Sequence, residues 1–134
     1  MFLDEQHSDI KETKTVIGYL GIAYCTLGFR NMEKGDYTES IQNFITGSEM
    51  LKKVDISDNY SFMVTVNTIL GTLLQKMELF EESITYLEYA MELSKAIHSD
   101  KDINSLSSEI KKTYSLWLNA EPNNIKAREG YQKY

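Results

Sequence analysis

The stretch from residue 27 to residue 50, LGFRNMEKGDYTESIQNFITGSEM, decides the fold, because a similar stretch, LGTLLQKMELFEESITYLEYAMEL, follows 43 positions later at residues 70–93. Both stretches begin with Leu-Gly and carry Glu-Ser-Ile at the same place. Where identity is lost, side-chain size is kept, since Phe44 aligns with Leu87. A period of about 20–50 residues is typical of repeat proteins, in which each unit buries its faces against its neighbours.

Apolar residues recur every three or four positions along most of the chain, the spacing that places side chains on one face of an α-helix. The pattern predicts helices at residues 15–34, 37–51, 62–77, 80–97 and 103–118, with a short helix at the C-terminal end. In the first helix it predicts an apolar face of Val16, Tyr19, Leu20, Ala23, Tyr24, Leu27 and Met32. Turns are expected at Gly35-Asp36, where Asp36 and Glu39 form a capping-box pattern, and near Glu78. One proline in 134 residues also favours an all-α fold.

Composition excludes several classes of function. Twenty acidic residues against fourteen basic ones give a net charge of −6, which disfavours direct binding to nucleic acid. A single cysteine, Cys25, cannot form an internal disulfide or supply a cysteine-based metal site. The first residues show no signal-peptide pattern, and no apolar run is long enough to cross a bilayer. We therefore expect a cytoplasmic protein without nucleic-acid or membrane partners.

No motif for catalysis is apparent. His7 and His98 are far apart in the sequence, and Cys25 has no histidine near it. The glycines at positions 18, 21 and 28 are spread along a predicted helix and do not form a phosphate-binding loop. The sequence predicts no enzyme activity, no cofactor and no metal.

The residues that recur in the repeat resemble the tetratricopeptide repeat. The first unit shows Leu27, Gly28, Gly35, Asp36, Tyr37, Ser40, Phe44 and Gly47, and the second shows Leu70, Gly71, Phe80, Ser83, Leu87 and Ala90. Glu78-Leu79 replaces the expected Gly-Asp. A weaker third unit has Ser115, Asn123, Ala127 and Tyr131. The period is longer than the usual 34 or so residues. In this respect the repeat is similar to long-helix variants in peptide-sensing bacterial regulators and in scaffolding proteins.

This resemblance implies an α-α superhelix, a solenoid of antiparallel helix pairs forming one domain over residues 1–134. The units are expected at about 15–54, 58–97 and 101–134, with residues 1–9 as the possible tail of a preceding helix. Both outer units look incomplete, so we expect a segment of a larger regulatory or scaffolding protein.

In the resembled family the first helix of each pair lines a concave face that binds peptides. Carried over by position, the lining is Ile22, Cys25, Thr26, Phe29, Met32 and Glu33 in the first unit. In the second unit it is Thr65, Thr68, Ile69, Thr72, Gln75 and Lys76, and in the third Glu109, Lys112, Thr113, Leu116 and Asn119. This lining lacks the cluster of Lys, Arg and Asn that family members use to hold acidic tails. An apolar or mixed extended peptide, or a helix, suits it better.

Two functional hypotheses follow. In the first, the chain is a protein-interaction module that binds a peptide or partner protein on the concave face. In the alternative, it is a structural spacer or a self-association unit without a ligand in the groove, forming a homodimer through Phe2, Leu3, Tyr131 and Tyr134.

Overall fold

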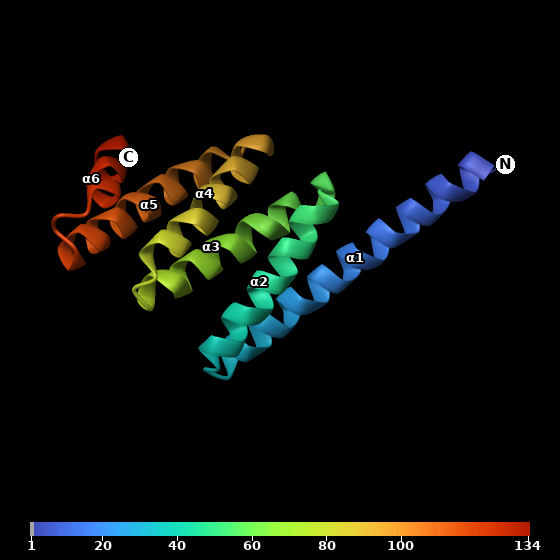
Figure 1. The fold of residues 1–134 in the computed structure, drawn as a ribbon, viewed down its shortest axis with the longest axis horizontal. Helices are drawn as coiled ribbons and strands as arrows, with labels where there is room; N and C mark the ends of the chain where they lie inside the picture. Colours follow the sequence, from blue (N-terminus) through green and yellow to red (C-terminus); the bar gives the residue numbers. More distant parts are fainter. Residues whose placement is uncertain (1) are drawn as a thin grey trace. The chain divides into compact units, whose positions relative to one another are not determined.

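The computed structural model describes residues 2–134, with side chains from Ile10 onward. The regular elements of the described chain are all helical (Figure 1). They are α1 (Phe2–Glu33), α2 (Tyr37–Val54), a short 3-10 helix η1 (Ser57–Asn59), α3 (Tyr60–Lys76), α4 (Phe80–Ala96), α5 (Asp100–Ala120) and α6 (Ile125–Lys133). The all-α prediction is confirmed.

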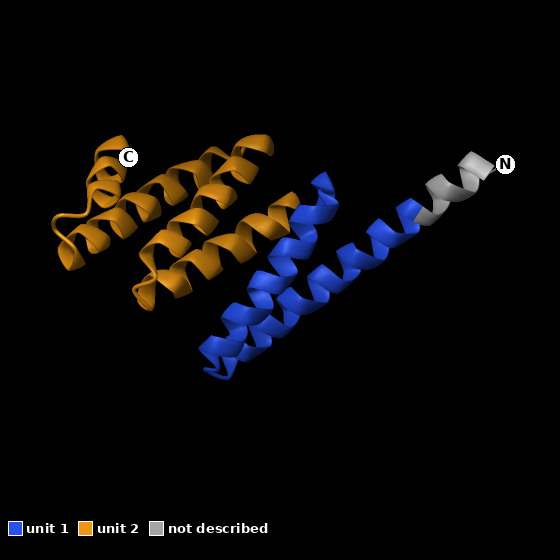
Figure 2. Cartoon of the chain, in the orientation of Figure 1, with its two compact units in different colours: residues 1–59 blue, residues 60–134 orange. Residues whose placement is uncertain are grey.

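The helices form two compact units, residues 1–59 and 60–134 (Figure 2). Unit 1 holds the α1–α2 hairpin. In unit 2, α3 packs on α4, α4 on α5, and α5 on α6. Helix α1 begins at Phe2, earlier than the expected residue 15. Residues 2–9, which the sequence assigned to the possible tail of a preceding helix, continue into the rest of α1 without a break.

The turn inside the first hairpin recurs in the second one. Gly35 has a left-handed backbone with φ of +81°, and Glu78, 43 positions later, has φ of +61°. The amide of Asp36 donates to the carbonyl of Asn31 at 2.9 Å, and the amide of Leu79 donates to that of Leu74 at 3.0 Å. These bonds close a helix C-terminus. Glu78 therefore stands where the first hairpin has Gly35, and the backbone follows the same path at both turns.

The capping box predicted at Asp36 is wrong. Asp36 precedes α2 but makes no side-chain capping bond. Glu39 accepts instead from Asn31 Nδ2 at 3.4 Å, so its carboxylate is turned towards the end of α1. Side-chain caps do form at α5, where Ser99 Oγ accepts from the amide of Asp102, and at α6, where Asn124 accepts from that of Ala127.

Close contacts inside the two hairpins repeat with the same 43-residue offset. A Cβ atom placed on Gly28 would lie 2.7 Å from Phe44 Cδ1, and one on Gly71 would lie 2.6 Å from Leu87 Cγ. Ser40 Oγ donates to the carbonyl of Gly28 at 2.8 Å, and its counterpart Ser83 donates to that of Gly71 at 2.6 Å. The small residues of the repeat are thus explained by helices that pack almost backbone to backbone.

The packed face of α1 is opposite to the predicted one. Its buried residues include Gly18, Gly21, Cys25 and Gly28. A Cβ atom on Gly21 would lie 3.1 Å from the carbonyl oxygen of Gly47 in α2. A bulky side chain does not fit there, so the close approach of the two helices selects the glycine face. The residues of the predicted apolar face are exposed, except Met32, which is half-buried.

Helix α6 also differs from the repeat pattern. Ala127 is fully buried, as its alignment with Ser40 and Ser83 suggests. Tyr131 aligns with Phe44 but is 40% exposed. Gly130 contacts the ring of Tyr114 instead, which leaves no room for a Cβ atom. Ala127 therefore keeps its place in the repeat pattern, whereas Tyr131 does not.

Candidate functional site

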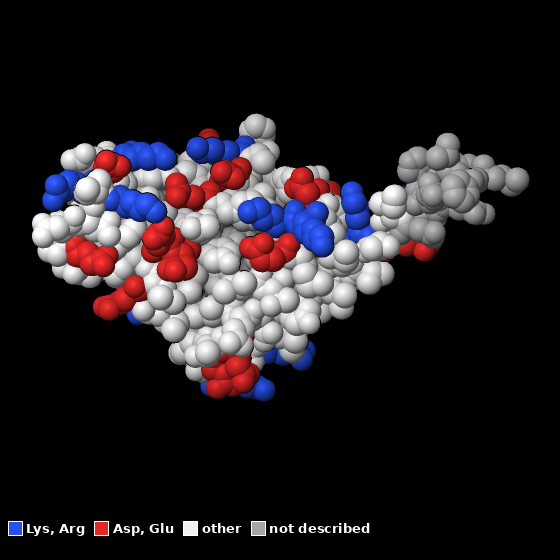
Figure 3. Space-filling view, viewed as in Figure 1, with Lys and Arg blue, Asp and Glu red and all other residues white. Residues whose placement is uncertain are grey.

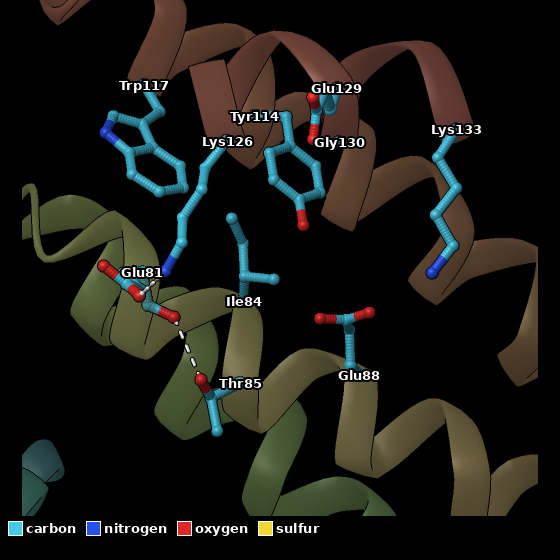
Figure 4. Close-up of a pocket in the computed structure, with 10 residues that line it drawn as sticks. All are labelled: Glu81, Ile84, Thr85, Glu88, Tyr114, Trp117, Lys126, Glu129, Gly130 and Lys133. Atoms are coloured by element: carbon cyan, nitrogen blue, oxygen red, sulfur yellow. Dashed lines mark hydrogen bonds and ion pairs between the residues drawn. The ribbon is translucent and has the colours of Figure 1, made fainter. Parts of the chain in front are cut away.

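A hollow of about 360 Å³ lies in unit 2 between α4, α5 and α6 (Figure 4). Ile84 and Trp117 belong to the small apolar core beneath it, together with Phe80 and Ala127. The residues that line the hollow are Glu81, Ile84, Thr85, Glu88, Tyr114, Trp117, Lys126, Glu129, Gly130 and Lys133.

Polar groups around this hollow bind one another. Lys126 Nζ lies 2.8 Å from Glu81 Oε1, and both side chains are mostly exposed. The hydroxyl of Tyr134 donates to Glu88 Oε2 at 2.8 Å. Burial, followed by this hydrogen bond, raises the pKa of Tyr134 well above its usual range. Burial also raises the pKa of Tyr114, with a further contribution from the charge of Glu88. Both phenols therefore stay protonated at neutral pH, and the contacts fasten the end of α6 to α4.

The described residues offer little else for chemistry. Among them, no group of three or more His, Cys, Asp or Glu side chains is placed to hold a metal ion. Cys25 is fully buried, and burial raises the pKa of its thiol to about 12. A thiol with that pKa is almost entirely protonated at neutral pH, so it is a poor nucleophile. None of the described helices is both long and apolar enough to span a bilayer.

The lining residues predicted in the first unit all lie on α1, but their exposure differs. Cys25 is buried against Gly47 and does not line a surface. Phe29 is half-buried and makes an edge-on contact with Phe44, with 5.0 Å between ring centroids, so it belongs partly to the hairpin core. Ile22 and Met32 are half-buried as well, whereas Thr26 and Glu33 are exposed.

The lining residues predicted for the second and third units lie on α3 and α5 of unit 2. Gln75 on α3 is buried, and its Nε2 donates to Thr113 Oγ1 at 2.7 Å and to Glu109 Oε1 at 3.1 Å. It therefore joins α3 to α5 and does not face a ligand. Thr68, Ile69 and Thr72 are half-buried, whereas the exposed members are Thr65, Lys76, Lys112, Leu116 and Asn119.

An exposed row of apolar side chains on α1 is the feature whose role the sequence did not predict. We call it the α1 stripe, and its members are Val16, Tyr19, Leu20, Ala23, Tyr24 and Leu27. The five large side chains of the stripe are between 37% and 70% exposed. Figure 3 shows few charged atoms over the middle of α1. The sequence shows that these residues share one face of the helix. It does not show that this face is exposed, because that depends on the glycine face packing against α2.

No model of a known protein family matches the chain, and no curated protein matches it. The fold and the surface together define an all-α protein of helical hairpins with an apolar stripe along its first helix.

Proposed function

We propose that the chain is a non-enzymatic protein-interaction module built from tetratricopeptide-like helix pairs, and that the α1 stripe is its binding surface. The likeness to the family is supported by the contacts that recur between Gly28 and Ser40 and between Gly71 and Ser83. A superhelical arrangement of the pairs is part of this proposal.

The exposure of the α1 stripe is the observation that carries the proposal. Single apolar side chains are common on protein surfaces, but continuous apolar patches of several hundred Å² mark interaction sites. The members of the stripe are spaced by three or four residues, as expected for a helix that docks against another helix or into a groove. Burying a leucine fully is worth about 1.5–3 kcal/mol, so covering several such residues gives a substantial driving force.

Peptide binding on α3 and α5, the first helices of the second and third predicted repeats, stays a prediction, and fewer observations support it. The hydroxyls of Thr68 and Thr72 donate to carbonyls of their own helix at 2.7 and 2.9 Å. Those donors are therefore already used, and Gln75 is buried. The predicted lining residues of unit 2 that are exposed and open to such a peptide are Thr65, Lys76, Lys112, Leu116 and Asn119.

The proposal is tested by placing a photo-crosslinking amino acid at the position of Leu20 and irradiating cells that produce the protein. We expect a covalent adduct with a protein partner. The matched control carries the same amino acid at the position of Ile125, which is 69% exposed but lies on α6. Circular dichroism of both purified proteins checks that the helices are intact. Absence of any adduct from Leu20, or equal adducts from both positions, would refute the assignment of this surface.

A further inference from the structure

The α1 stripe is symmetric about a point between Gly21 and Ile22. Val16 and Leu27 are equally far along the chain from that point, and so are Leu20 and Ala23. With 3.6 residues per turn, these four side chains fall within an arc of about 60° around the helix axis. The stripe therefore presents nearly the same apolar surface in both directions along the helix.

Two opposite charges flank the row on one edge. Glu12 and Arg30 are 18 residues apart, so they lie on the same side of α1, separated by about five turns or roughly 27 Å. Both side chains are exposed, and neither makes an ion pair with any other described residue. The negative charge is near one end of the stripe and the positive charge near the other.

This arrangement is complementary to itself in one direction only. When two copies of α1 pair antiparallel about a two-fold axis at the centre of the stripe, Val16 meets Leu27 of the second copy and Leu20 meets Ala23. Glu12 of each copy then lies beside Arg30 of the other. In a parallel pair the Glu12 and Arg30 edge of one copy would lie opposite the other edge of the second copy, so neither charge would have its opposite beside it.

We infer that the α1 stripe binds a second copy of this chain, with the two α1 helices antiparallel. The inference rests on the proposed function, which assigns the stripe as an interaction surface, and adds the identity of the partner. The large side chains expose on the order of 500 Å² per copy, so the pair buries about 1,000 Å², the size at which specific interfaces begin. A two-fold contact of this kind uses the same patch on both copies and closes on itself.

This dimer differs from the one that the sequence suggested. That model used Phe2, Leu3, Tyr131 and Tyr134. Phe2 and Leu3 lie outside the residues whose side chains are described. Tyr134 is half-buried and bonded to Glu88, and Lys111 Nζ lies 5.0 Å from the centre of the Tyr131 ring, so both tyrosines already have contacts within unit 2.

The test uses sedimentation equilibrium of the purified full chain at several protein concentrations. We expect a monomer–dimer equilibrium for the wild type. Glu12→Arg and Arg30→Glu each convert two attractive contacts into repulsive ones, so each should raise the dissociation constant roughly tenfold. The double variant restores opposite charges in the antiparallel pair and should return the constant to within about threefold of the wild type.

A second variant probes the apolar centre. Leu20→Glu places two like charges near the symmetry axis and should raise the dissociation constant by more than about a hundredfold. Ile125→Glu makes the same kind of change outside α1 and should leave it unaltered. Circular dichroism verifies that each variant remains helical.

Three outcomes would overturn the inference: a wild-type chain that stays monomeric, a dimer that persists with Leu20→Glu, or a double charge variant as weak as the single ones. A monomeric chain that nevertheless forms an adduct from the position of Leu20 with a protein of different mass would refute self-association and leave the proposed function standing. Absence of every adduct would refute both.

Discussion

Replacing Gly28 by alanine tests whether the α1–α2 hairpin is held by close helix packing. A Cβ atom there would lie 2.7, 2.8 and 3.0 Å from Cδ1, Cε1 and Cγ of Phe44. Distances below 3.0 Å require a shift of the neighbouring atoms. The Phe44 ring is fully buried and contacts Phe29, so it has little freedom to move.

The magnitude follows from two opposing effects. Inserting a methyl group into a tightly packed core typically costs about 1–3 kcal/mol. Alanine is favoured over glycine inside a helix by about 0.8–1 kcal/mol. We therefore expect Gly28→Ala to lower the free energy of unfolding by up to about 2 kcal/mol, measured by urea denaturation followed by circular dichroism.

Gly18 provides a control on the same helix. The nearest atoms to a Cβ at Gly18 are Ile56 Cδ1 and Val54 Cγ2, both at 4.0 Å, which is ordinary van der Waals contact. Gly18→Ala should therefore gain the helix preference without the clash and stabilise the protein by about 0.5–1 kcal/mol. If Gly28→Ala proves as stable as Gly18→Ala, the packing described for the hairpin is wrong.

Two further predictions concern single contacts. Ser83→Ala removes the hydrogen bond to the carbonyl of Gly71 and should lower the free energy of unfolding by about 1 kcal/mol in urea denaturation. Ser105→Ala, at an exposed position inside α5, should not lower it, because alanine favours the helix. Equal values for the two variants would contradict the role of the bond. Because burial raises the pKa of the Cys25 thiol from 9.0 to about 12, the folded state keeps its proton where the unfolded state loses it, so this contribution to stability disappears as the pH rises from 9.0 to about 12. In denaturation curves at successive pH values, Cys25→Ala should lose less stability over that range than the wild type. An identical loss in the variant and the wild type would show that the Cys25 thiol is not its cause.

Part of the fold was predictable because the sequence repeats the residues that make contacts. Gly28, Gly71, Ser40 and Ser83 stand at equal offsets, and the structure gives them equal contacts. The second turn shows why identity alone is insufficient. Glu78 adopts the left-handed conformation of Gly35, since backbone hydrogen bonds close the turn whichever residue occupies it.

The candidate site was less predictable, because periodicity identifies an apolar face without saying what covers it. The row from Val16 to Leu27 is the more hydrophobic side of α1, yet the glycine side packs on α2. Exposure of individual lining residues depended on partners distant in sequence. Gln75 is 38 residues away from Thr113, and no local pattern reveals that their side chains meet.

Because α1 has two faces, binding of a partner to one face changes the free energy of unfolding of the hairpin packed on the other. One face holds α2, and the opposite face carries the α1 stripe. A partner that binds the folded stripe and not the unfolded chain adds RT ln(1 + [L]/Kd) to the free energy of unfolding. Since the same helix makes both contacts, occupancy of the stripe also protects the glycine contacts beneath it. The stability of unit 1 is then set by the concentration of its partner as well as by its own sequence.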